Sequence, residues 1–232
     1  MIQKPILSLC IPTYNNSDAV FAKIQRILAS KSKLFQIVIS DNRSDDDILE
    51  KLSKVKDSRL KIVVLPENRG SVFNIMNAYA NADGMYAMIC MDKDGIRPEN
   101  LDSAISILKD GEINFGYFAL KSKNTQIEKA VCLTKNSDDC LLKFGYRAMH
   151  PSGTFFKTQI IRDLFGDFHL ADANIVDGFI TDFMLAEASK YGNGAVLDFD
   201  FMEIDAPPFK GKKHSDTYSP ARGNVFFCPE NR

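Results

Sequence analysis

Short apolar runs alternate with segments of helical periodicity along the first hundred residues, and this alternation limits the folds open to the chain. The apolar runs span residues 6–11, 36–40, 60–65 and 85–91. Segments with helix caps and apolar residues at helical spacing follow them, near residues 17–28, 45–55, 71–80 and 98–109. Strands joined by helical crossovers form a parallel sheet with helices on both faces. The sequence therefore predicts an α/β fold, with Pro12 ending the first strand.

The second half of the chain has a less regular pattern. Strands are expected at residues 114–120, 127–133 and 195–202. Helices are expected at residues 138–144, 158–164 and 177–191. A polar loop at residues 150–153 leads into an apolar Thr-Phe-Phe run. From residue 207 onward, lysines stand among prolines and glycines, and we expect this tail to be mobile.

Charge and cysteine content exclude several classes of function. Lys and Arg number 29 against 30 Asp and Glu, a formal net charge of -1, so a general nucleic-acid binder is disfavoured. The five cysteines include no C-x-x-C pair, which argues against a zinc site or a disulfide framework. No apolar window approaches the roughly 18 residues of a membrane span, and the N-terminal run is too short for a signal peptide. We therefore expect a soluble, cytoplasmic protein.

Polar segments follow each of the four strands expected in the first half. They occupy residues 12–15, 41–42, 66–70 and 92–95. In open parallel sheets, ligands bind beyond the carboxyl ends of the strands. These segments are therefore the first place to look for a functional site.

Asp92 and Asp94, one residue apart, directly follow the fourth apolar run. Two carboxylates at a strand end suit a hard divalent cation, which prefers oxygen ligands. The alternative is an ordinary strand-ending turn, in which Asp-Gly is common. The residues alone leave both interpretations open.

Two other strand ends offer contacts to a nucleotide. Asp41 is placed to accept hydrogen bonds from a ribose or a base edge, or else to mark the start of the next helix. Arg69 is suited to pairing with phosphate, or else is a solvated loop arginine. Both alternatives stay open for each residue.

The segment from 167 to 205 is strongly acidic, with nine Asp and Glu residues against Lys190 alone. Asp177, Asp182 and Glu187 are spaced by five, about 140° per step on a helix, so they do not share one face. One of them is therefore a candidate general base. His214, in the basic tail, is a candidate phosphate or metal contact.

Taken in order, the strand-end motifs resemble the family 2 glycosyltransferases of the GT-A fold. The segments that carry the resemblance are LSLCIPTYNN, QIVISDNRSDD, LPENRG and MDKDG. The strong match covers residues 5–110, and a looser one continues through HPSGTFF to GNGAVLDFDF. It implies a Rossmann-like, mostly parallel GT-A sheet with a smaller acceptor-side subregion. It also implies one domain over 1–232, with a donor half (1–110), an acceptor half (111–206) and the tail (207–232).

The resemblance implies a nucleotide-sugar donor, with a UDP-sugar expected, held by the strand-end segments. The matching residues are Pro12, Thr13, Tyr14, Asn15, Asp41, Asn68, Arg69, Gly70 and Asp92. Within this set, Asp41 resembles the carboxylate that contacts the nucleoside. Asp92 resembles a contact of the sugar or ribose.

The resemblance also implies a divalent cation, Mn²⁺ or Mg²⁺, and a catalytic base. Asp94 resembles the direct metal ligand, and we group Asp92 and His214 with it as metal candidates. The pair Thr181-Asp182 resembles the family's Glu-Asp pair, whose aspartate removes the acceptor proton in an inverting transfer. The first residue of that pair differs here.

No membrane-spanning or long accessory region is expected after the core, which disfavours the polymerising synthases of the family. A stand-alone enzyme adding one sugar to a glycan or lipid-linked saccharide fits better, with at most peripheral attachment to the inner face of the membrane. The alternatives are a nucleotidyltransferase and a non-catalytic nucleotide-sugar-binding module of the same fold. The first loop IPTYNN lacks the glycine and basic residues usual in nucleotidyltransferases.

Overall fold

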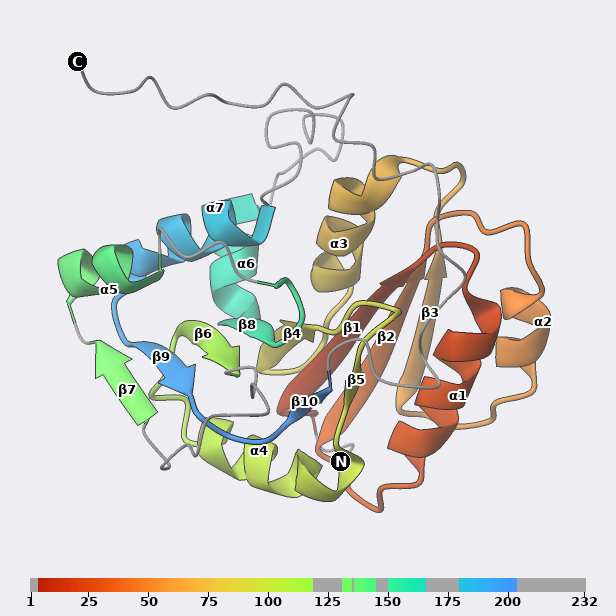
Figure 1. Cartoon of the computed structure of the whole chain (residues 1–232), viewed down its shortest axis with the longest axis horizontal. Helices are drawn as coiled ribbons and strands as arrows, with labels where there is room; N and C mark the ends of the chain where they lie inside the picture. Colours follow the sequence, from red (N-terminus) through yellow and green to blue (C-terminus); the bar gives the residue numbers. More distant parts are fainter. Residues whose placement is uncertain (1–3, 119–130, 135, 145–149, 166–179, 204–232) are drawn as a thin grey trace.

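The computed structural model describes residues 4–118, 131–134, 136–144, 150–165 and 180–203 (Figure 1). Its centre is an eight-stranded sheet in the order β3-β2-β1-β4-β8-β6-β9-β7. The first half of the chain supplies four parallel neighbours: β1 (Leu7–Thr13), β2 (Phe35–Asp41), β3 (Leu60–Val64) and β4 (Tyr86–Ile89). The crossovers between them carry α1 (Ser17–Leu28), α2 (Ile48–Ser53) and α3 (Gly70–Ala80). The alternation of strands and helices predicted from the sequence is confirmed.

The second half extends the same sheet with mixed directions. Its strands are β6 (Phe115–Phe118), β7 (Val131–Thr134), β8 (Thr154–Lys157) and β9 (Gly194–Leu197). Strand β8 runs antiparallel between β4 and β6, and β9 is parallel to β6. Strand β7 is antiparallel to β9 at the edge. Only β7 and β8 oppose the other strands, so the described sheet is mostly parallel, as predicted.

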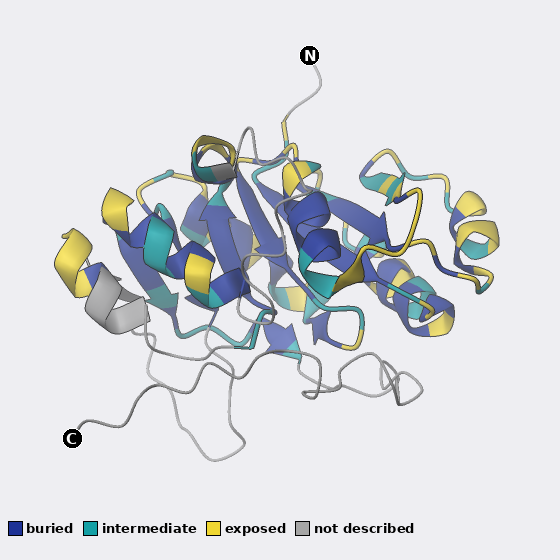
Figure 2. Ribbon diagram, turned by 90° about the horizontal axis from the view of Figure 1, so that it is seen from above, coloured by how far each residue is buried: buried dark blue, intermediate teal, exposed yellow. Residues whose placement is uncertain are grey.

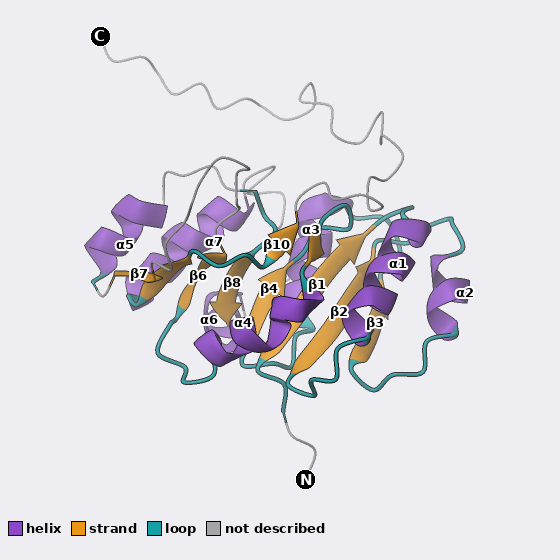
Figure 3. Ribbon diagram, turned by 60° about the horizontal axis from the view of Figure 1, so that its bottom comes forward, coloured by secondary structure: helices purple, strands orange, loops and turns teal. Residues whose placement is uncertain are grey.

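Helices cover both faces of the sheet (Figure 3). Leu9 and Ile11 of β1 pack in one core with α1, α2 and α4 (Leu101–Leu108). Cys10, between them, points into a second core with α3, α6 (Thr158–Phe165) and α7 (Ile180–Ala188). Because successive side chains of a strand alternate between faces, a continuous apolar run is what a doubly covered strand requires. Strands β1, β2 and β4 are accordingly almost entirely buried, while the edge strand β3 is partly exposed (Figure 2).

Strand β1 does not stop at Pro12, as the sequence predicted, but continues to Thr13. Cys10 O accepts the N–H of Cys90, so the even-numbered residues of β1 direct their backbone groups toward β4. The register with β4 ends at Cys10. Pro12 has no N–H to donate, but its nitrogen points toward β4 beyond the last residue paired with that strand. The proline therefore costs the sheet no hydrogen bond.

Two other elements differ from the prediction. Helix α2 begins at Ile48 rather than near residue 45. The residues before it form a loop, in which the side chain of Asp46 accepts the N–H of Ser17 at 2.8 Å. The strand expected at 195–202 is interrupted after Leu197. Its last part forms β10 (Met202–Glu203), which pairs antiparallel with β5 (Gly95–Ile96). Strand β5 begins at the residue after Asp94.

The remaining described elements are the short helices η1 (Pro98–Asn100), α5 (Ser137–Phe144) and η3 (Ser189–Tyr191). Among the residues described, no helix is long and apolar enough to cross a membrane. The tail from residue 207 and most of the acidic segment before α7 lie outside the described residues.

Candidate functional site

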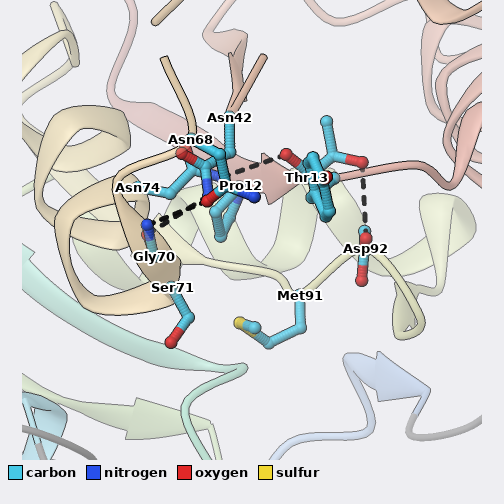
Figure 4. A pocket seen from close by; sticks show the side chains of 10 residues that line it. Pro12, Thr13, Asn42, Asn68, Gly70, Ser71, Asn74, Met91 and Asp92 are labelled. Carbon is cyan, nitrogen blue, oxygen red and sulfur yellow. Dashed lines mark hydrogen bonds between the residues drawn. The ribbon is translucent and has the colours of Figure 1, made fainter. Parts of the chain in front are cut away.

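A pocket of about 220 Å³ opens beyond the carboxyl ends of β1, β2 and β4 (Figure 4). Its described lining consists of Pro12, Thr13, Tyr14, Asn42, Asn68, Gly70, Ser71, Asn74, Met91 and Asp92. Six of these were predicted as donor-binding residues from the sequence; Asn42, Ser71, Asn74 and Met91 were not. Asn15, Asp41, Arg69 and Asp94, also predicted, lie outside this lining.

The first loop turns sharply after Tyr14 because Asn15 takes a left-handed backbone conformation, with φ of 52°. Asparagine tolerates this conformation better than most residues. The Asn15 N–H donates to Ser44 Oγ at 2.9 Å, and Asn15 Oδ1 accepts the N–H of Asp45 at 2.8 Å. Asn15 thus joins the first loop to the segment after β2.

Asp41 is fully buried at the end of β2. Its Oδ1 accepts the Ser44 hydroxyl at 2.5 Å and the Ser44 N–H at 3.2 Å. These bonds fix the turn after β2. In the structure as it stands, it is the next residue, Asn42, that reaches the pocket.

Asn42 holds the third strand-end loop in place. Its Nδ2 donates to Asn68 Oδ1 at 2.8 Å, and its Oδ1 accepts the N–H of Arg69 at 2.9 Å. Asn68 Oδ1 also accepts the N–H of Gly70 at 3.0 Å. The two asparagines therefore form one amide network along the pocket wall.

Helix α3 begins at the pocket with Gly70 and Ser71. Gly70 has φ of +82°, while an added Cβ would meet nothing within 4 Å, so the backbone angle rather than space favours glycine here. The guanidinium of Arg69 lies 3.8 Å from the centre of the Phe73 ring. Because Gly70 and Ser71 line the pocket, the first turn of α3 lies beside it, with N–H groups that have no partner within the helix.

The side chain of Asn74 links α3 to strands β1 and β2 by hydrogen bonds. Its Nδ2 donates to Thr13 O at 3.1 Å, and its Oδ1 accepts the Ser40 hydroxyl at 2.6 Å. Asn77 Nδ2 donates to Ser40 Oγ at 2.7 Å. The signal in the sequence was two asparagines on the buried side of an apolar helix, where polar residues need partners.

The two carboxylates of the Asp-x-Asp pair have different surroundings. Asp92 is half-buried and lines the pocket, and its Oδ2 accepts the Thr13 hydroxyl at 3.3 Å. Asp94 is fully buried, and its Oδ2 accepts the Ser152 hydroxyl at 2.5 Å. The first and fourth strand ends thus meet at Asp92, while Asp94 faces the 150–153 loop.

The 150–153 loop is fastened to the Asp-x-Asp turn by Ser152 and His150. Ser152 Oγ accepts the N–H of Met91 at 2.8 Å while donating to Asp94. The Ser152 N–H donates to His150 Nδ1 at 3.3 Å, which leaves the ring proton on Nε2, 3.5 Å from Asp94 Oδ2. The sequence indicated this loop but not its contact with Asp94.

Ser152→Ala should lower the free energy of unfolding by about 1–3 kcal/mol, because it removes the hydroxyl that accepts the Met91 N–H and donates to the buried Asp94 carboxylate. Urea unfolding measures the change. Ser53→Ala, which removes an exposed hydroxyl bonded to Glu50 O, serves as the control and should change stability by less than about 0.5 kcal/mol. Equal effects of the two substitutions would contradict the bridging role of Ser152.

The pKa of the Cys90 thiol reflects the charges around the Asp-x-Asp turn. Burial raises the pKa of the Cys90 thiol to about 11; the Lys23 ammonium opposes this rise, and the Asp94 and Asp92 carboxylates add to it. Lys23 is itself fully buried, on helix α1. The negative charge of the Asp-x-Asp pair therefore lies close to a buried positive charge.

The profile of one protein family matches most of this chain: "Glycosyl transferase family 2", over residues 8–170. The chain belongs to glycosyl transferase family 2. The match includes all four strand ends that surround the pocket. The family resemblance noted in the sequence is confirmed.

Curated relatives of this family 2 member are distant. One is the "UDP-Glc:alpha-D-GlcNAc-diphosphoundecaprenol beta-1,3-glucosyltransferase WfgD" of Escherichia coli, 26% identical over 179 residues, which are 68% of this chain and 70% of WfgD. The chain spans only about half the length of the first curated relatives that it matches.

Solved structures show the same fold. S. aureus TarS, residues 1–349, superposes with a TM-score of 0.67 at 18% identity, covering 86% of this chain and 60% of that one. The same fragment was solved with UDP-GlcNAc. The mannosyltransferase PcManGT from Pyrobaculum calidifontis, in complex with GDP-Man and Mn²⁺, has a TM-score of 0.59 at 16% identity, covering 84% of this chain and 55% of that one. The predicted GT-A fold is confirmed.

Among the described residues, no group of three or more His, Cys, Asp or Glu side chains forms a metal site, but oxygen-bearing side chains lie at the pocket. The Asp92 carboxylate and the Thr13 hydroxyl both present oxygen at the pocket, and oxygen is what Mg²⁺ and Mn²⁺ prefer. Asp94 is two residues away but has no exposed side-chain surface, so it reaches a cation only if its contact with Ser152 changes. His214 lies outside the described residues.

Asp182 lies in the first turn of α7 and is half-buried. The buried side of α7 consists of Ile180, Thr181, Met184, Leu185 and Ala188. Phe183, between these positions, is 39% exposed. Asp182 is not part of the described pocket lining, so its role as base stays a prediction.

Proposed function

We propose that this protein transfers a sugar from a UDP-sugar to a saccharide or lipid-linked saccharide. The observation that carries the proposal is the pocket itself. In a member of glycosyl transferase family 2, the pocket joins the ends of β1, β2 and β4 to the start of α3, with Asp92 at its rim. This is where an open α/β sheet binds nucleotides.

The start of α3 is the proposed seat of the donor diphosphate. The first N–H groups of a helix have no partner within it, and the helix dipole favours an anion there. Gly70 and Ser71 lie at the pocket wall; the Gly70 N–H already donates to Asn68 Oδ1, so the N–H groups that follow it in the turn are those proposed to face the diphosphate. At about 220 Å³, the pocket is smaller than the roughly 300–1,000 Å³ of most ligand sites. It therefore holds part of the donor, and the rest extends beyond it toward the acceptor.

Uridine is the proposed nucleoside because the names of WfgD and of a TarS complex include UDP-sugars. The guanosine donor of the PcManGT complex is the comparison that a binding experiment must include. Asn42 and Asn68 fix each other and the 68–70 loop, so the pocket is formed before the donor arrives. Such preorganisation lowers the entropic cost of binding.

In the proposed reaction, the acceptor hydroxyl oxygen attacks the anomeric carbon from the side opposite the diphosphate. The carbon–oxygen bond to the diphosphate breaks, and its electron pair leaves with UDP. Asp182 takes the proton of the acceptor hydroxyl as general base. One displacement of this kind inverts the anomeric configuration.

Asp92, with Asp94 beside it, is the proposed holder of Mn²⁺ or Mg²⁺. A divalent cation there neutralises negative charge on the leaving diphosphate. The chain's own contribution is to keep the Asp92 carboxylate at the pocket, through the Thr13 hydroxyl and the turn that Ser152 fastens. The α3 N–H groups would act on the same diphosphate.

The acceptor, location and domain division are further parts of the proposal. The diphosphoundecaprenol in the name of WfgD supports a lipid-linked acceptor and action at the inner face of the membrane, with the protein attached peripherally. We keep the division into a donor half (1–110), an acceptor half (111–206) and a tail (207–232). No nucleic acid partner is proposed.

Binding of UDP is the first test. With Mn²⁺, UDP at about 100 times its Kd should stabilise the parent chain by about 2.7 kcal/mol, and UDP should bind more tightly than GDP. Calorimetry and thermal unfolding measure both. Tighter binding of GDP would overturn the choice of base, and binding of neither nucleotide would overturn the proposed function.

Turnover separates the remaining alternatives. Release of UDP from a UDP-sugar without acceptor supports a glycosyltransferase, whereas binding without release indicates a binding module. Incorporation of labelled UTP into a nucleotide-sugar, with release of pyrophosphate, would indicate a nucleotidyltransferase instead.

A further inference from the structure

A lysine is buried in the middle of helix α1, on its apolar side. The buried positions of α1 include Val20, Ile24 and Ile27, and Lys23 lies among them with 1% of its surface exposed. Burying an ammonium group costs free energy unless it is hydrogen-bonded. The hydrogen-bond partners of the Lys23 ammonium therefore explain why the lysine is tolerated in the core.

Lys23 Nζ donates to Met91 O at 2.6 Å and to Asp92 O at 3.0 Å. Met91 O also accepts the N–H of Asp94 at 3.0 Å, which closes a four-residue turn from Met91 to Asp94. The ammonium thus binds the carbonyl that closes this turn and the carbonyl of the next residue. Met91 and Asp92 both line the pocket, so the ammonium holds the backbone of two lining residues.

The position of Asp92 then depends on contacts from three directions. Lys23 donates to the backbone carbonyl of Asp92, and the Thr13 hydroxyl donates to the Asp92 carboxylate. Ser152 accepts the N–H of the preceding residue, Met91. Only the bonds from Lys23 are made by a full positive charge, and hydrogen bonds to charged groups are the stronger kind. Without them, Asp92 O loses the ammonium as a donor, and Met91 O keeps the N–H of Asp94 but no charged donor.

We propose that Lys23 is a positioning residue for the Asp-x-Asp turn, fixing the Asp92 carboxylate at the donor pocket. The proposal deepens the proposed function, since it concerns the site where the donor and cation would bind. Lys23 itself touches neither. It acts through the backbone of Met91 and Asp92.

Arg59 provides a matched control. It is also a buried cation that donates to backbone carbonyls, those of Leu28, Ser30 and Ser32. It directly precedes β3, so it lies at the amino ends of the parallel strands, the edge opposite the pocket. Lys23→Met and Arg59→Met each remove a buried cation that donates to backbone carbonyls, at opposite edges of the sheet; Arg59→Met also breaks an ion pair with Asp57.

The first measurement is hydrogen–deuterium exchange of the ligand-free chain. Lys23→Met should speed exchange of amides in the 91–97 segment by about tenfold or more, because the turn opens locally more often. Arg59→Met should leave that segment unchanged even where it lowers overall stability. Unchanged exchange of the 91–97 segment in Lys23→Met would overturn the proposal, and this outcome does not depend on whether UDP binds.

The second measurement is the Kd of UDP with Mn²⁺ by calorimetry, at a temperature where each variant is folded by circular dichroism. We expect about a tenfold weaker Kd for Lys23→Met, a loss of about 1.4 kcal/mol. The Kd of Arg59→Met should match that of the parent chain. Equal Kd values for the parent and Lys23→Met would overturn the proposal. Failure of the parent itself to bind UDP would count against the proposed function, with the exchange measurement still deciding on Lys23.

A second pair of variants covers the case in which Lys23→Met does not fold. Lys23→Arg keeps a charged donor at the same place and should restore slow exchange of the 91–97 segment. Lys23→Gln keeps a shorter, neutral donor and should exchange faster than Lys23→Arg. The reverse order of the two would contradict a role for the positive charge.

Discussion

Replacing Asp182 by asparagine is expected to slow sugar transfer by about 10²–10⁴-fold, the usual contribution of a general base, while UDP binding stays as in the parent chain. Asparagine keeps the size and shape of the side chain but does not accept the acceptor proton. Asp182 lies in the first turn of α7, half-buried, where a carboxylate is compatible with the helix dipole. Rates of transfer to a saccharide acceptor and the Kd of UDP, measured together, check this expectation.

Glu187→Gln is the matched control for this substitution. Glu187 is on the same helix, and its carboxylate pairs with Lys190 at 2.6 Å on an exposed part of the surface. Such pairs contribute little to stability, so transfer by Glu187→Gln should be nearly normal. An inactive Asp177→Asn beside a nearly normal Asp182→Asn would falsify the assignment and move the base to Asp177, which lies outside the described residues.

The first half of the fold was predictable because its signals are local. Strands β1, β2 and β4 are buried on both faces and therefore appear as continuous apolar runs, while the edge strand β3 is apolar but partly exposed. The rule that ligands bind at carboxyl strand ends then identified residues 12–15, 41–42, 66–70 and 92–95. Six of the ten described pocket residues come from the specific residues predicted in these segments.

The contacts within the site were not predictable in the same way, because they join residues far apart in the sequence. Asp41 and Asn42 are neighbours with similar polarity, yet Asp41 is buried against Ser44 and Asn42 reaches the pocket. The period of a strand decides which of two successive side chains faces which side. A shift of one residue therefore exchanges their roles.

Lys23 and Ser152 show the same limit more strongly. A lysine among apolar positions 20, 24 and 27 signals a buried charge, but its partners at Met91 and Asp92 are 68 and 69 residues away. Ser152 meets Asp94 across 58 residues. The antiparallel insertion of β8 between β4 and β6 creates that meeting, and a pattern of apolar residues does not encode the order of strands in a sheet.

The Asp-x-Asp pair gives the second large expected effect. Asp92→Asn should remove most of the Mn²⁺-dependent gain in UDP affinity, a loss of about tenfold or more, because one cation-binding charge at the pocket is replaced by a neutral amide. The apo chain should keep its stability, since Asp92 is half-buried and its described side-chain bond, to the Thr13 hydroxyl, is long at 3.3 Å. Calorimetry with UDP, in Mn²⁺ and in chelator, measures the gain.

Asp94→Asn should differ from Asp92→Asn in one respect that the structure makes specific. It too should lose the Mn²⁺-dependent gain, but it should also lower the free energy of unfolding of the apo chain by about 1–3 kcal/mol. The reason is that the Asp94 carboxylate is fully buried and accepts the Ser152 hydroxyl, so its charge contributes to the fold as well as to the site. If Asp92→Asn keeps the Mn²⁺-dependent gain while Asp94→Asn loses it, Asp94 is the metal ligand and Asp92 is not. If both keep it, the turn does not bind the cation, and the charge on the diphosphate must be met by the first turn of α3.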